Sequence, residues 1–226
     1  MTTEHQELQR IRDAYGRRKP ISCPDYVRYV REERESHYRL LLGRLGKDLH
    51  EVSLIELGCG QGGELERLIA LGLTPKQVTG VELLSARVER AREALPAEVR
   101  VIQGDATACP FPDSAFRVVF ISTVFSSILD PAFRWRLGQE AWRLVAPGGA
   151  VMVYDFCIGN PRNPDVCGIP RSEIVRLFPD AENEFHRVTL APPIGRAIAP
   201  LGGRVYRLAS AIPLLRTHVI GWLRKA

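Results

Sequence analysis

The residues with the clearest chemical potential lie in the segment LIELGCGQGGELERL, residues 54–68, where an apolar run ends at a carboxylate and a glycine cluster opens a helical pattern. Two glycine spacings are satisfied at once: GxGxxG by Gly58, Gly60 and Gly63, and GxGxG by Gly58, Gly60 and Gly62. The first spacing is typical of loops that hold a dinucleotide diphosphate, but a lone match leaves the ligand open. A tight turn from strand to helix with no ligand is a third interpretation.

The charges beside these glycines favour a cationic ligand. Glu56 stands two residues before Gly58, and Glu64 and Glu66 occupy the first turn of the next helix, with no Lys or Arg to meet a diphosphate there. A diphosphate on this helix end would be repelled by three carboxylates. The sulfonium and ammonium groups of S-adenosylmethionine would be attracted, and Glu56 is placed to reach the ammonium directly or through water. Because Glu64 and Glu66 also suit a helix N-terminus, the interpretation rests mainly on Glu56.

Two further carboxylates end predicted strands. Glu82 follows Gly58 by 24 residues, where a carboxylate can accept hydrogen bonds from both ribose hydroxyls of an adenosine cofactor. Asp105 ends the next predicted strand and can accept from the adenine amino group, while the backbone of Ala106 offers a donor. These carboxylates predict an adenosine site and are common to adenosine cofactors generally.

The elements that must position these residues alternate along the chain. Strands that alternate with helices predict a parallel sheet with helices on both faces. Pro110 and Pro112 predict that the crossover between the third and fourth strands is mostly loop. The expected strands are 52–57, 77–82, 99–103, 117–122, 150–156, 185–190 and 217–223. The expected helices are 4–15, 26–45, 63–70, 85–94, 132–145 and 171–178.

Four segments, taken together in this order, resemble the class I S-adenosylmethionine-dependent methyltransferases: LIELGCGQGG, VTGVELLSARVERAR, VIQGDATACPFPDSAFRVVF and LVAPGGAVMV. The resemblance implies an α/β fold with a doubly wound, mostly parallel, Rossmann-like sheet of seven strands. The sixth strand would run parallel and the last antiparallel, with helices before the core and a helical insert between strands six and seven. It implies S-adenosylmethionine as cofactor, bound by Glu56, Gly58, Cys59, Gly60, Gly62, Glu82, Leu83, Asp105, Ala106 and Ser122.

The length of 226 residues suits a single domain. We expect an N-terminal helical extension over 1–48, a cofactor-binding core over 52–156 and a substrate-side region over 157–226. The insert, 192–215, would leave and re-enter the carboxyl edge of the sheet above the methyl donor. Its apolar residues alternate with arginines, which is compatible with a lid, with a helical pair that only covers the sheet edge, and with contact to an anionic membrane surface.

Methyl transfer needs alignment of nucleophile, methyl and sulfur, and it needs no metal. In this family, acceptors meet the methyl beside the carboxyl ends of the fourth and fifth strands. We therefore expect acceptor contacts from Tyr26, Phe125, Tyr154, Arg162 and Asn163. A hydroxyl acceptor usually needs a general base, whereas an amine needs only to arrive neutral.

The candidates for a general base are Asp155 and His218, with His37 as a further possibility. A lone histidine is more often a core or surface residue, and Asp155 could instead cap the turn 160–164. Packing against the core is likewise the simpler interpretation of Tyr26.

Several partner classes are disfavoured. The segment ISTVFSSI lacks the Asn/Asp-Pro-Pro-aromatic signature of enzymes that methylate nucleobase amines, and no basic stripe accompanies the net charge of +5, so nucleic acid is not expected. The five cysteines are odd in number and lack zinc-site spacing. A cytoplasmic protein, peripheral at the membrane if the insert binds there, is expected because neither a signal peptide nor a spanning segment is visible.

The predicted function is transfer of a methyl group to a small molecule, favouring a hydroxyl-bearing saccharide or a lipid-linked acceptor. Carbon methylation of a quinone-like ring is the alternative within the class. From other classes, an NAD-dependent oxidoreductase is disfavoured by Glu56, and a non-catalytic cofactor-binding protein stays open. The oligomeric state is not predicted by the sequence.

Overall fold

A computed structural model describes residues 3–17, 23–46, 48–160 and 163–226. Within them the chain forms one seven-stranded sheet in the order β3-β2-β1-β4-β5-β7-β6. β1 to β5 are parallel, and β7 is antiparallel to both of its neighbours, so β6 runs in the same direction as the parallel strands. The predicted doubly wound fold with its antiparallel last strand is confirmed. The strands are Leu54–Leu57, Val78–Glu82, Arg100–Gln103, Phe116–Ser122, Val145–Phe156, Glu182–Leu190 and Arg216–Arg224.

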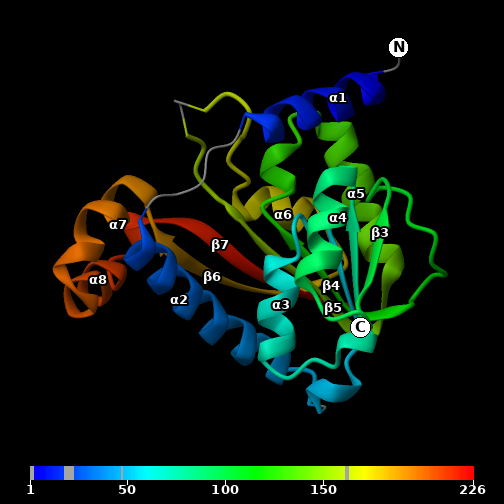
Figure 1. Ribbon diagram of the computed structural model, residues 1–226, viewed down its shortest axis with the longest axis horizontal. Coiled ribbons are helices and arrows are strands. Elements are labelled where there is room, and N and C mark those ends of the chain that lie inside the picture. The colour runs from blue at the N-terminus through cyan, green and yellow to red at the C-terminus, as the bar shows by residue number, and fades with distance from the viewer. Residues whose placement is uncertain (1–2, 18–22, 47, 161–162) are drawn as a thin grey trace.

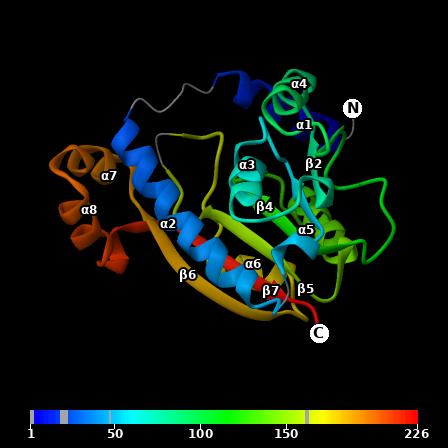
Figure 2. The ribbon, with the colours of Figure 1, turned by 60° about the horizontal axis from the view of Figure 1, so that its bottom comes forward.

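Helices cover both faces of the sheet, as Figures 1 and 2 show. Side chains of α2 (Pro24–Gly43), α3 (Gly63–Ala70) and α4 (Ser85–Ala94) pack in one buried cluster. Side chains of α5 (Pro131–Leu144) and α6 (Arg171–Leu177) pack in the other. Successive strand residues alternate between the two clusters, because side chains of a strand point to opposite faces in turn. Both faces of the central strands are therefore apolar.

Among the element boundaries that differ from the sequence prediction, two have clear local reasons. β5 begins at Val145 instead of residue 150, because Val145 already pairs with Phe116 before the register shifts at the following turn. α2 begins at Pro24, where proline is favoured because the first helical N–H groups need no partner. The predicted loop between β3 and β4 is confirmed, since no helix is assigned between Gln103 and Phe116.

The carboxyl ends of β1, β2 and β4 converge on the glycine loop. Gly58, Gly60 and Gly62 all have positive φ, a conformation that side chains other than glycine rarely adopt. A Cβ atom at Gly58 would also lie 2.6 Å from Val124 Cγ2, and one at Gly60 would lie 2.6 Å from an Arg87 nitrogen. The glycines are therefore required by the backbone path itself.

The insert between β6 and β7 is helical, as predicted. It consists of α7 (Pro192–Ile198), η4 (Ala199–Leu201), α8 (Gly203–Ser210) and η5 (Pro213–Leu215). Both of its ends lie at one edge of the sheet, where the Ala191 amide donates to the Leu215 carbonyl over 2.8 Å. In Figures 1 and 2 it extends past the sheet beside the first turns of α2.

Candidate functional site

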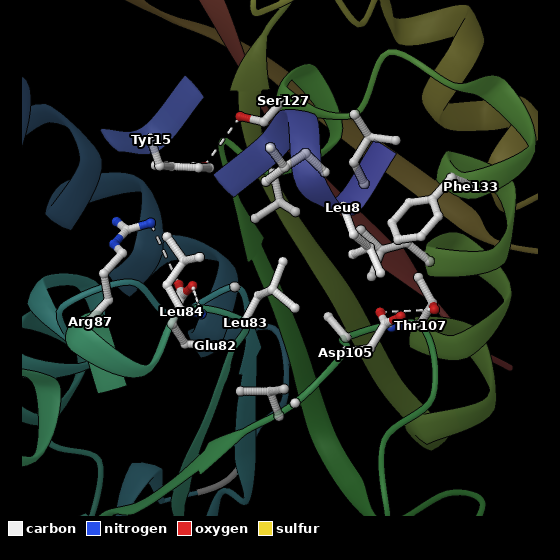
Figure 3. A pocket seen from close by; sticks show the side chains of 18 residues that line it. Leu8, Tyr15, Glu82, Leu83, Leu84, Arg87, Asp105, Thr107, Ser127 and Phe133 are labelled. Atoms are coloured by element: carbon white, nitrogen blue, oxygen red, sulfur yellow. Dashed lines mark hydrogen bonds and ion pairs between the residues drawn. The ribbon is translucent and has the colours of Figure 1, made fainter. Parts of the chain in front are cut away.

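A largely apolar cavity lies where the parallel strands end. It is lined by Glu82, Leu83, Asp105 and Ala106, which the sequence predicted as the adenosine site, and by Gly58 of the glycine loop. α1 (Thr3–Gly16) forms its cover, and Figure 3 shows side chains of this helix facing the strand ends. The covering side chains are Leu8, Ile11 and Tyr15.

Glu82 is held rigidly at the end of β2. Its two oxygens accept hydrogen bonds from the amides of Gly60 and Leu84, each over 2.9 Å, and the Arg87 guanidinium lies 3.6 Å away. Each carboxylate oxygen has more than one acceptor position, so these bonds leave capacity for a hydroxyl donor. Asp105 is fixed in a similar way, because one of its oxygens accepts from the amide and the hydroxyl of Thr107.

A second cavity adjoins the first and shares Tyr15, Gly58 and Arg87 with it. It is lined by most of the remaining residues that were predicted to bind the cofactor, namely Glu56, Cys59, Gly60 and Ser122. Together the two cavities form one path along the glycine loop. The third predicted glycine contact, Gly62, caps the N-terminus of α3 and lines neither cavity.

Glu56 is the most unusual group of the second cavity. It is only 1% exposed, and its Oε2 atom has no hydrogen-bond partner among the described residues. Burial, followed by the neighbouring Glu64 carboxylate, raises the pKa of Glu56 well above its ordinary value. A buried carboxyl group without a partner is costly, and a cationic ligand would relieve that cost.

An arginine that the sequence analysis missed reaches the same cavity from α2. Arg34 donates to Glu64 over 2.6 Å and to Ser122 over 3.1 Å. Its guanidinium also lies 3.8 Å from the centre of the Tyr154 ring. The premise that a ligand at the glycine loop meets no arginine is therefore wrong, since Arg34 and Arg87 both line the cavity.

A signal for Arg34 was present in the sequence. Tyr26, Val30, Arg34 and Tyr38 recur at a spacing of four on α2, which places the arginine inside a stripe that faces the sheet. A charged residue in such a stripe indicates a buried partner or a polar site. Here the partners are Glu64 and the Tyr38 hydroxyl.

Comparison with known proteins agrees with this geometry. Residues 54–149 match a family model described as a methyltransferase domain. The chain is 33% identical over 110 residues to 27-O-demethylrifamycin SV methyltransferase of Amycolatopsis mediterranei, covering 46% of this chain and 39% of the relative. It is 34% identical over 106 residues to demethylmenaquinone methyltransferase of Thermus thermophilus, covering 46% of each. The chain thus spans less than half the length of these curated relatives.

Solved structures share the fold. Geranyl diphosphate C-methyltransferase of Streptomyces coelicolor, solved with S-adenosyl-L-homocysteine, superimposes with a TM-score of 0.57 at 18% identity, covering 83% of this chain and 75% of that one. Residues 54–149 are thus similar to a methyltransferase domain, and the fold is that of the class I S-adenosylmethionine-dependent methyltransferases. The match to the family model leaves out α1, α2 and the insert.

The site fits the cofactor of class I methyltransferases. The partnerless oxygen of Glu56 suits an ammonium group, and the guanidinium of Arg34 suits a carboxylate beside it. The neighbouring cavity supplies Glu82 for hydroxyl groups and apolar walls for a flat ring. The ammonium group, the carboxylate and the adenosine of this cofactor thus have complementary residues along the two joined cavities.

Tyr154 is fixed at the end of β5, beside the second cavity. The Arg34 guanidinium lies over its ring, and the His218 ring stacks on it at 5.0 Å and 11°. Its hydroxyl shares a 3.0 Å hydrogen bond with Thr189, and its carbonyl accepts from the Thr123 amide over 2.7 Å. Both threonines have positive φ, which is rare for β-branched residues and typical of functional sites.

Neither of the two predicted bases has the surroundings that a general base needs. His218 is 4% exposed, and burial, with a smaller effect of Arg34, lowers its pKa to about 3. Asp155 is fully buried on the opposite side of β5. Its oxygens accept from the amides of Ser126 and Phe156, so it holds the turn η3 (Phe125–Ser127) instead of capping the turn 160–164. Neither residue is among those that line the two cavities.

The four other predicted acceptor contacts do not gather beside Tyr154 in the described structure. Phe125 is fully buried in the core against Phe178, a correction to its predicted place because the η3 turn directs it inward. Tyr26 is buried under the insert and donates to the Leu190 carbonyl, so packing accounts for it. Asn163 accepts from the Asp165 amide in a loop that contacts α1. Arg162 lies outside the described residues.

Proposed function

We propose that this protein binds S-adenosylmethionine along the two joined cavities and transfers its methyl group to a small lipophilic acceptor. The observation that carries the proposal is the buried Glu56 carboxyl group, whose Oε2 atom has no partner among the described residues and faces a cavity that Arg34 also lines. A ligand that carries a positive and a negative group side by side fits Glu56 and Arg34. A diphosphate offers no positive charge for Glu56.

The cofactor supplies an activated methyl group, and the chain supplies the alignment. In our proposal Glu56 binds the ammonium group and Arg34 binds the carboxylate of the same amino acid. Glu82 binds the ribose hydroxyls, and Asp105 with Ala106 binds the adenine edge. α1 excludes water from the adenosine, because Leu8 and Ile11 cover the cavity.

We propose the acceptor class from the substrates in the relatives' names and from the insert, which lies outside the matched domain. The relatives are named for methylation of a rifamycin, a menaquinone precursor and geranyl diphosphate, all of which carry large apolar parts. The insert of this chain is also rich in apolar residues. A hydroxyl-bearing lipophilic molecule or a lipid-linked saccharide is our first candidate. Carbon methylation of a quinone-like ring is the second, favoured by the similarity to demethylmenaquinone methyltransferase.

Calorimetry tests the choice of cofactor. S-adenosylhomocysteine should bind to the purified protein, and NADH should bind more weakly or not at all. Tighter binding of NADH would overturn the assignment of the cavities. Mass spectrometry then tests the acceptor: lipid extracts, quinols and lipid-linked saccharides are incubated with the protein and the methyl donor, and products heavier by one methyl group are sought.

Arg34 gives a sharper test of how the amino-acid part of the cofactor is oriented. In the unaltered protein, S-adenosylmethionine should bind more tightly than its decarboxylated analogue, because only the former has a carboxylate for Arg34. Arg34→Met should reduce that preference to near one. Arg67→Met is the matched control, since Arg67 also pairs with Glu64 but does not line the second cavity. An undiminished preference in Arg34→Met would contradict the proposed orientation.

A further inference from the structure

The insert presents an apolar surface to solvent. Leu201, Leu208 and Leu214 are 67%, 73% and 82% exposed, and Val205 and Ile212 are exposed beside them. Val205 and Leu208 lie three residues apart on α8 and share one side of it, whereas Tyr206 and Ser210 are buried on the other. We call these five exposed residues the insert face. A grouped apolar surface of this kind marks a contact with a partner or a membrane.

Positive charge accompanies the insert face. Arg196 is exposed on α7, and Arg204 and Arg207 are exposed on α8. Residues 192–215 contain no Asp or Glu. Within the part of the chain that the structure describes, none of the three has an ion pair with a carboxylate. The surface is therefore both apolar and cationic. Its arginines can extend along apolar groups and keep their charges at a polar boundary.

We infer that the insert face docks on an anionic lipid bilayer, an inference that deepens the proposed function and rests on its lipophilic acceptor. Lipid phosphates supply the negative charges that the insert itself lacks, and the acyl region accepts exposed leucines. A second copy of the chain is a poorer occupant. A symmetric contact through this face would set arginines against arginines with no carboxylate of the insert between them.

The position of the insert connects the bilayer to the cofactor site. Both ends of the insert join the sheet at the edge where β6 ends and β7 begins. The Tyr206 ring lies 4.7 Å from the Tyr29 ring of α2, and the same helix carries Arg34 into the second cavity. A membrane under the insert face would thus lie next to the acceptor side of the sheet. A lipophilic acceptor could then reach the site without crossing water.

Sedimentation with vesicles tests the inference in the absence of cofactor and acceptor. The full chain should bind vesicles of phosphatidylcholine mixed with phosphatidylglycerol, and should bind pure phosphatidylcholine about tenfold or more weakly. Leu208→Glu with Leu214→Glu, and separately Arg204→Glu with Arg207→Glu, should each reduce binding by about tenfold or more. Arg39→Glu with Leu40→Glu is the matched control, because both residues are exposed on α2 outside the insert. It should bind as the unaltered chain does.

A second measurement reports insertion directly. Leu214→Trp should show a blue shift of tryptophan fluorescence with anionic vesicles, since the ring leaves water at an exposed position. Equal binding of the insert variants and the control, or no binding at all, would overturn the inference. The inference would also be overturned if the chain formed a dimer in solution that Leu208→Glu dissociates, and did not bind vesicles. Vesicle binding without any methyl transfer would instead defeat only the proposed function.

Discussion

At the scale of single residues, the cofactor site depends on charges that are balanced inside the protein. Glu64 is paired with Arg34 and Arg67, and Glu82 is held by backbone amides with Arg87 nearby. Glu56 differs from both, because one of its oxygens has no partner in the described part of the chain. Discrimination between ligands therefore depends on this residue more than on the total charge of the loop.

Glu56→Gln should lower the affinity for S-adenosylhomocysteine by roughly 1 to 3 kcal/mol, the usual effect of losing a charge-assisted hydrogen bond. The unliganded variant should unfold no more easily at neutral pH, because a neutral amide avoids the cost of a buried carboxylate. Calorimetry and denaturant unfolding measure the two effects. Glu66→Gln, exposed on α3, is the control and should change neither. Unchanged affinity in Glu56→Gln would remove the main support for the cationic ligand.

Asp155 predicts a pH dependence of stability. Burial, only partly offset by hydrogen bonds from Ser126 and Phe156, raises its pKa from 3.8 to about 6. A folded-state pKa above the unfolded value means that the native state binds the proton more tightly. The stability that protonated Asp155 contributes is therefore lost as pH rises from its unfolded pKa through its folded pKa. Relative to Asp155→Asn, the unaltered protein should lose about 3 kcal/mol between about pH 4 and about pH 7. A constant difference in unfolding free energy would contradict the shift.

At the scale of elements, much of the fold could be predicted from the sequence. The alternation of apolar strands and amphipathic helices gave every element of the core, because burial on both faces of a parallel sheet leaves a strong pattern. The doubly wound sheet and its antiparallel last strand followed from the family resemblance. The carboxyl-edge position of Gly58, Glu82 and Asp105 followed from the strand ends that precede them.

The contributions of α1 and α2 to the site could not be read from local pattern. Arg34 meets Ser122 across 88 residues of sequence, and Leu8 and Ile11 line one cavity with Glu82 at the end of β2, which is also distant in sequence. A helical period indicates that such a helix packs, but it does not indicate against what. Phe125 shows the converse error. Its position after β4 suggested the acceptor side, but the η3 turn rotates it into the core.

The cover formed by α1 should respond to the cofactor. Leu8, Ile11 and Tyr15 line the adenosine cavity, so a bound adenosine should hold this helix in place. Hydrogen exchange of the α1 amides should therefore slow when S-adenosylhomocysteine is bound. The amides of α6, which lines neither cavity, provide the internal control. Exchange in α1 that is unaffected by saturating ligand would show that the helix does not cover the site.

At the scale of the whole molecule, our proposal separates cofactor binding from acceptor selection along the sheet. The matched methyltransferase domain ends at residue 149, whereas β6, β7 and the insert form the other side of the sheet. Among the described residues, no helix is long and apolar enough to cross a membrane.

Replacement of residues 192–214 by a short Gly-Ser turn should separate the two activities. Ala191 and Leu215 already share a backbone hydrogen bond, so a turn can connect them. Affinity for S-adenosylhomocysteine should change little, because no residue of the insert lines either cavity. Methylation of the lipophilic acceptor should be lost. Circular dichroism and calorimetry check the fold and the cofactor site, and full turnover in the shortened chain would refute a role of the insert in acceptor use.

The adjacency of β6 and β7 has a consequence for how this enzyme can diversify. The two strands pair along their length from Glu182 with Arg224 to Leu190 with Arg216, so the segment between them is anchored at neighbouring points. The entropy needed to close such a connection grows only with the logarithm of its length. Segments of very different size can therefore be exchanged there without disturbing the catalytic half, which makes this junction a natural grafting point for new substrate ranges.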